Sequence, residues 1–156
     1  MSSREVVEAF FAFRAAQDVD MACALLHDSI VYKIHAATNN LPFGGEQRGV
    51  DACRNVLFSI LKDFDYLAYE PTILSARGLM VRTQVRFKYR HRRTGGILEG
   101  TRRLVFKVKG GRIVRIDGYH DAKLVAAFMK LTEYRLANNM VAETPVLPKR
   151  ETQGSA

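Results

Sequence analysis

The sequence lacks several features that would point directly to a class of protein. Its two cysteines, Cys23 and Cys53, are too few for a disulfide framework and have no metal-ligand spacing. No stretch approaches the roughly 20 apolar residues of a membrane span. The apolar N-terminal segment is interrupted by Glu8 and Arg14, which favours an amphipathic helix over a signal peptide. We therefore expect a cytoplasmic protein with structural thiols, no metal, no cofactor and no membrane association.

The composition is typical of one soluble globular domain. The chain has 156 residues, of which 47% are hydrophobic and 26% charged, and this length suffices for a single core. Its formal net charge of +8 permits attraction to anions, including nucleic acid, but specifies no partner. We expect a domain over residues 1–136 and a polar, proline-bearing tail over residues 137–156.

Hydrophobic periodicity changes from helical to alternating along the chain. Helical spacing predicts helices over 4–16, 21–26, 50–64 and 122–136. Alternation predicts strands over 29–35, 72–76, 79–92, 97–109 and 112–119, and residues 38–49 are rich in turn formers. This order predicts a single-domain α+β fold, in which one strongly curved, mainly antiparallel sheet wraps the N-terminal helices.

The order of elements also resembles a known superfamily. Three segments carry the resemblance: "QDVD" before a short helix, "LPFGGEQRGVDAC" leading into the third helix, and "GYHDAKLVAAF" at the end. Over residues 4–134 the chain resembles the nuclear transport factor 2-like superfamily, which includes ketosteroid isomerases and SnoaL-type polyketide cyclases. The resemblance implies a cystatin-like cone with a ligand-binding cavity. It implies no particular reaction, because members share the cone while the residues lining it differ.

The catalytic groups of the ketosteroid isomerases are missing. Those enzymes carry a tyrosine, a catalytic aspartate and an acidic hydrogen-bond donor where this sequence aligns Phe10, Ile34 and Leu104. A slip of one residue would place Lys33 and Arg103 there, which still supplies no carboxylate base. We therefore expect no ketosteroid isomerase activity.

Strand alternation predicts which side chains face the cavity. It carries Arg102 inward among apolar neighbours and points His120 inward near the mouth, together with Tyr32. A buried guanidinium can hold a carboxylate or a developing oxyanion, and a neutral imidazole can act as a base near pH 7. His120 is thus the candidate catalytic residue. The candidate ligand-binding residues are Tyr32, Ile34, Tyr89, Arg102, Leu104 and Ile116.

Simpler structural interpretations stay open for the same residues. The polar trio of Tyr32, Arg102 and His120 could satisfy itself by hydrogen bonds or water. Asp121 directly precedes a predicted helix, so we interpret it as an N-cap, and alternation places Tyr119 on the convex face. We expect His27 and His91 at the surface, and His35 where the first strand enters the loop.

Three functions are compatible with the sequence. The first is a small-molecule binder or enzyme for a largely apolar, acidic ligand, with acid–base chemistry of an isomerase, cyclase or hydrolase type. The second is a non-catalytic module that forms a homodimer through the convex sheet face. The third is nucleic-acid binding through the basic row Arg82, Arg86, Lys88, Arg90 and Arg92. Little aromatic interleaving and pairing with Glu99 disfavour the third.

Overall fold

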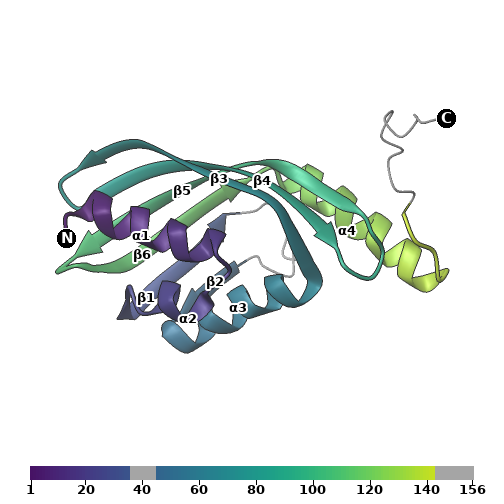
Figure 1. The fold of residues 1–156 in the computed structure, drawn as a ribbon, viewed down its shortest axis with the longest axis horizontal. Coiled ribbons are helices and arrows are strands. Elements are labelled where there is room, and N and C mark those ends of the chain that lie inside the picture. The colour runs from purple at the N-terminus through teal and green to yellow at the C-terminus, as the bar shows by residue number, and fades with distance from the viewer. Residues whose placement is uncertain (36–44, 143–156) are drawn as a thin grey trace.

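A curved six-stranded sheet is the centre of the computed structural model, which describes residues 1–35 and 45–142 (Figure 1). The strands are β1 (Leu26–His35), β2 (Gly45–Arg48), β3 (Phe64–Arg77), β4 (Met80–His91), β5 (Ile97–Lys109) and β6 (Arg112–His120). Their order in the sheet is β2-β1-β6-β5-β4-β3. Neighbouring strands are antiparallel except β1 and β6, which are parallel. The expected mainly antiparallel α+β fold is confirmed.

Three helices cover one face of the sheet, and a fourth extends from its end (Figure 1). They are α1 (Ser3–Ala15), α2 (Val19–Cys23), α3 (Val50–Asp63) and α4 (Ala122–Ala137). Helix α1 contacts β3, β4, β5 and β6, while α3 contacts β1, β2 and β3. The interior therefore lies between these helices and the concave face of the sheet.

The helix starts follow local capping chemistry. Ser2 and Glu5 form a reciprocal capping box at the start of α1. Asp121 Oδ1 accepts hydrogen bonds from the backbone N–H groups of Lys123 (3.0 Å) and Leu124 (3.1 Å). These two bonds confirm that Asp121 caps α4.

Two strands differ from the sequence prediction. Strand β3 begins at Phe64, directly after α3, whereas alternation in the sequence predicts a strand only over 72–76. Pro71 lies within β3 and is tolerated there because β3 is an edge strand. Strand β2 lies inside the predicted loop and pairs with β1. Residues 36–44, which include the first part of that loop (38–44), and the tail from residue 143 lie outside the described residues.

The alternating faces of the long strands form the core as predicted. The inner face of β4 consists of buried residues: Val81, Thr83, Val85, Phe87 and Tyr89. On β6 strict alternation fails at one end, because it predicts Val114 on the core face together with Ile116. Val108 pairs with Ile113 and Lys107 with Arg115, so Val114 is an extra residue in a bulge. Ile113 is fully buried instead.

The thiols and one histidine complete the core. Cys23 in α2 and Cys53 in α3 are free and buried, and burial raises the pKa of both thiols, that of Cys53 to about 11. Both are therefore poor nucleophiles, as expected of structural thiols. His91 was expected at the surface, but it is buried under Phe64, and its Nδ1 accepts a hydrogen bond from Thr94 N–H (3.3 Å). In the described part of the chain, no helix is long and apolar enough to cross a membrane.

Candidate functional site

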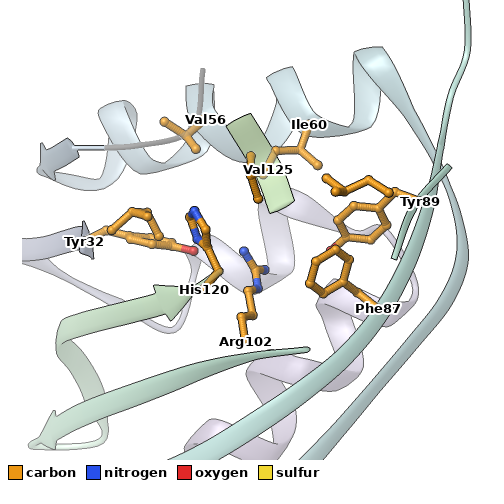
Figure 2. A pocket seen from close by; sticks show the side chains of 10 residues that line it. Tyr32, Val56, Ile60, Phe87, Tyr89, Arg102, His120 and Val125 are labelled. Carbon is orange, nitrogen blue, oxygen red and sulfur yellow. The ribbon is translucent and has the colours of Figure 1, made fainter. Parts of the chain in front are cut away.

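A small cavity lies between the concave sheet face and helices α3 and α4 (Figure 2). Its volume is about 40 Å³, which corresponds to roughly three water molecules. The lining residues are Tyr32, Ile34, Val56, Ile60, Phe87, Tyr89, Leu98, Arg102, His120 and Val125. Most of these side chains are apolar, and none is a carboxylate. At this volume a ligand with a benzene ring fits only if lining side chains move apart.

The structure brings most of the predicted site residues together. Tyr32, Ile34, Tyr89, Arg102 and His120 all line the cavity. The cavity therefore combines side chains from β1, β4, β5 and β6, as alternation along these strands predicts.

Leu104 and Ile116 do not line the cavity, although both were candidate ligand-binding residues. Their exposed fractions are 1% and 0%, and they belong to the core. A Cβ at Gly118 would lie 2.8 Å from Ile34 Cδ1 and 3.1 Å from Leu104 Cδ2. The absence of a side chain at Gly118 therefore leaves room for both Ile34, which lines the cavity, and Leu104, which does not.

Five apolar lining residues were not recognised as part of the site: Val56, Ile60, Phe87, Leu98 and Val125. Four of them, Val56, Ile60, Phe87 and Leu98, lie at positions of α3, β4 and β5 that sequence periodicity predicts to face inward. The sequence does not show at which position along the strands α3 and α4 contact them.

Arg102 presents one edge of its guanidinium group to the site. Its Nε and Nη2 atoms are buried and have no hydrogen-bond partner among residues 1–35 and 45–142. These two nitrogens share an edge of the guanidinium, so their N–H bonds are parallel and match a carboxylate in bidentate geometry. The Arg102 Cζ atom lies 5.9 Å from the centroid of the Phe87 ring. Burial by itself lowers the pKa of Arg102, whereas the neighbouring Tyr32 and Tyr89 raise it. The net shift of the pKa is upward, so the group stays charged.

His120 lies directly opposite Arg102 in the pairing of β6 with β5. Its Nε2 atom is buried and makes no hydrogen bond within the described structure. Burial lowers the pKa of His120, the positive charge of Arg102 lowers it further, and Asp121 opposes them. The imidazole is therefore neutral near pH 7 and available for proton transfer.

Two tyrosines flank these basic groups. Figure 2 shows Tyr32 reaching toward His120 from one side and Tyr89 lying beyond Arg102 on the other. The Tyr89 hydroxyl is buried, and the described residues offer it no hydrogen-bond partner. The expected trio of Tyr32, Arg102 and His120 thus gathers at the cavity, with Tyr89 as a fourth polar group.

The interior is positively charged. A second guanidinium, that of Arg14 on α1, is only 3% exposed and donates a hydrogen bond from Nη2 to the Tyr66 hydroxyl (2.9 Å). Among the buried polar residues of the described segments there is no carboxylate. Arg14 is buried, and Arg102 is half-buried with its Nε and Nη2 atoms enclosed; two such cations without a buried anion in the described residues favour an anionic or electron-rich ligand. No three potential metal ligands cluster anywhere in the described ranges.

Comparison with known proteins agrees with this fold. The family model described as a SnoaL-like domain matches residues 7–116. An NTF2-like protein from Burkholderia thailandensis is 25% identical with a TM-score of 0.72, covering 83% of this chain and 98% of that one. A Bacillus subtilis protein, provisionally named as an isomerase, is 20% identical with a TM-score of 0.71, covering 82% and 92%.

A Xanthomonas campestris protein, provisionally named as a polyketide cyclase, is 17% identical with a TM-score of 0.65, covering 81% of this chain and 96% of that one. No curated protein matches the chain by sequence. At these identities the solved structures show the cone fold and do not assign a reaction.

Proposed function

Since this chain belongs to the SnoaL-like domain family, we propose that its cavity binds a small, largely apolar ligand with one carboxylate or similar oxyanion. One observation carries the proposal: the Nε and Nη2 edge of Arg102 is buried in an apolar cavity and has no hydrogen-bond partner in the described residues. A bound carboxylate would satisfy both donors at once. Hydrogen bonds to charged groups contribute about 1.5–3 kcal/mol each, so Arg102 would dominate the affinity.

His120 is the acid–base group in this proposal. It enters the cavity beside Arg102 and is neutral near pH 7, so it can accept a proton from a ligand whose acid group Arg102 holds. Negative charge that develops on the ligand would be stabilised by the guanidinium. Isomerase, cyclase or hydrolase chemistry of this general kind agrees with the provisional names of two solved relatives.

Calorimetric titration with benzoate and its uncharged isostere benzamide tests the binding proposal. We expect wild-type protein to bind benzoate and to discriminate against benzamide. Arg102→Met should weaken benzoate binding by about tenfold or more, which is the loss of one charged hydrogen bond. Arg103→Met is the matched control, because Arg103 is exposed on the convex face. Equal binding of both compounds, an unaffected Arg102→Met variant or no binding of benzoate would each contradict the proposal.

The alternative is a non-catalytic, cytoplasmic module that acts as a homodimer. The small volume of the cavity favours it, since a nearly filled cone leaves little space for a substrate. The convex face offers Tyr119, which is 38% exposed and stacks on His35 with ring centroids 4.5 Å apart. Dimerisation and ligand binding are compatible, so the benzoate titration decides only whether the cavity is a binding site.

Part of the positive charge of the basic row is neutralised by ion pairs with acidic side chains. Arg86 pairs with Glu70 (2.9 Å), and Arg90 and Arg92 both pair with Asp65 (3.2 Å each). Lys88 is the cross-strand partner of Glu99, as expected. These pairs support a solvated surface over a nucleic-acid site.

A further inference from the structure

The Tyr89 hydroxyl is a second recognition group that the carboxylate proposal leaves unused. It lies on β4 in the cavity wall, its residue is only 5% exposed, and the hydroxyl oxygen has no hydrogen-bond partner within residues 1–35 and 45–142. Buried hydroxyl groups are almost always hydrogen-bonded, because leaving one unpaired is costly. The group that pairs with Tyr89 is therefore expected inside the cavity.

Aromatic packing holds Tyr89 in place. Its ring stacks on Tyr66 with centroids 4.4 Å apart and packs against Phe87 (4.9 Å) and Phe64 (6.0 Å). Arg14 in turn anchors Tyr66 by the hydrogen bond from Nη2 to the phenol oxygen. A side chain enclosed in this way cannot readily turn its hydroxyl toward solvent, so the hydroxyl is a preorganised contact.

Tyr69 provides an internal comparison. Its hydroxyl is also buried, with no hydrogen-bond partner among the described residues. The Tyr69 ring, however, lies under the guanidinium of Arg14 (5.3 Å) and does not line the cavity. Among the tyrosines that the structure describes, only Tyr89 therefore combines an unpaired hydroxyl with a position beside Arg102 in the cavity wall.

We propose that the ligand is a hydroxy- or oxo-substituted carboxylic acid whose carboxylate lies on Arg102 and whose second oxygen hydrogen-bonds the Tyr89 hydroxyl. This inference rests on the proposed function, because Arg102 must first hold the acid group. A phenol can donate to a carbonyl oxygen and can also accept from a hydroxyl group, so both oxygen functions suit Tyr89. Apart from Tyr32 and His120, the other described lining residues are apolar, which favours a hydrocarbon frame between the two oxygen functions.

Substituted benzoates test this inference with matched isosteres. We would compare 3- and 4-hydroxybenzoate with 3- and 4-methylbenzoate by calorimetric titration. A methyl group has nearly the size of a hydroxyl group but makes no hydrogen bond. For wild-type protein we expect the hydroxy acid to bind about tenfold more tightly than its methyl partner at one of the two ring positions. In Tyr89→Phe this preference should disappear, so that each hydroxy acid binds no more tightly than its methyl partner. Tyr69→Phe should keep the preference.

The outcomes separate this inference from the proposed function. If benzoate does not bind, or binds equally well to Arg102→Met, both the proposed function and this inference are overturned. Arg102-dependent binding of benzoate, with equal affinities for hydroxy and methyl acids, overturns only the second oxygen contact. A preference that survives in Tyr89→Phe assigns the contact to another group and also overturns it. If Tyr89→Phe fails to fold, equal wild-type affinities for the hydroxy and methyl acids still overturn the inference.

Discussion

Arg102 and His120 are cross-strand partners in the β5–β6 pairing, so two basic side chains enter one cavity from adjacent strands. The cavity lining contains no carboxylate that could orient His120. A histidine–carboxylate pair does exist on the convex face, where His35 Nε2 and Asp117 Oδ1 are 2.8 Å apart and Arg115 also binds Asp117. The acidic group that complements the interior is therefore expected from a ligand.

The stability of the folded protein should fall as the pH decreases below about 6.5, the usual pKa of histidine. Burial and the charge of Arg102 lower the pKa of His120 in the folded state, so the unfolded chain takes up its proton at higher pH. This contribution to stability is present above the unfolded pKa and is lost on acidification.

Urea unfolding at pH values between about 5 and 8 measures this dependence. We expect His120→Gln to reduce the slope of stability against pH. Some slope should remain, because burial also lowers the pKa of His91. An identical slope in His120→Gln and wild type would contradict the assignment.

Tyr66 should ionise more readily than its buried neighbours Tyr69 and Tyr89. Burial raises the pKa of Tyr66, but the charge of Arg14, its hydrogen bond and the charge of Arg102 together lower it below the usual value. Burial raises the pKa of Tyr69 and Tyr89. In an alkaline titration followed by phenolate absorbance, Tyr66→Phe should remove an early component.

Arg14→Met tests the cause of that shift, because it removes the cation and leaves Tyr66 buried. We expect the early component to move to higher pH. Circular dichroism over the same pH range shows whether the chain stays folded. An early component that survives Tyr66→Phe belongs to another tyrosine and refutes the prediction.

Phe106→Ala should reduce the free energy of unfolding by roughly 3–5 kcal/mol. Phe106 is 0% exposed and makes edge contacts with Phe10 (5.6 Å) and Phe11 (5.3 Å) of α1, so its loss leaves a cavity between helix and sheet. Phe58→Ala, at an exposed position, is the control and should change stability little. A loss below about 1 kcal/mol for Phe106→Ala would mean that this face is not tightly packed.

Asp121→Ala should destabilise the protein by about 1 kcal/mol through loss of the α4 cap. Asp121→Asn keeps an acceptor oxygen at the same place and should retain most of the stability. Benzoate affinity, measured in parallel, should be nearly the same in both variants. A large loss of benzoate binding in Asp121→Asn would instead indicate that the carboxylate acts in the site.

A homodimer through the convex face should be visible by light scattering at micromolar concentration. Tyr119, which is exposed, belongs to the expected contact. The Arg103 Cζ atom lies 5.9 Å from the centroid of the Tyr119 ring. Tyr119→Glu should shift the mass toward the monomer, and Tyr134→Glu on α4 should not. A clean monomer mass for wild-type protein rejects this interface.

The sequence by itself determined the features that depend on neighbours along the chain. Period-two alternation placed Val85 and Phe87 inward, because successive side chains of a strand point to opposite faces. The same rule carried Arg102 and His120 to the concave side. Asp121 was identified as a cap because a carboxylate before a helix meets unpaired N–H groups.

Only the tertiary structure decided the features that depend on contacts between distant segments. Alternation could not show that Leu104 is enclosed in the core while Arg102, two residues away on the same face, lines the cavity. Leu104 packs beside Gly118 of the neighbouring strand, which is a contact between distant segments. The bulge at Val114, the burial of His91 and the pairing of Arg14 with Tyr66 also follow from register and helix position. Local periodicity carries no information about these long-range contacts, because they form only when the sheet closes over the helices.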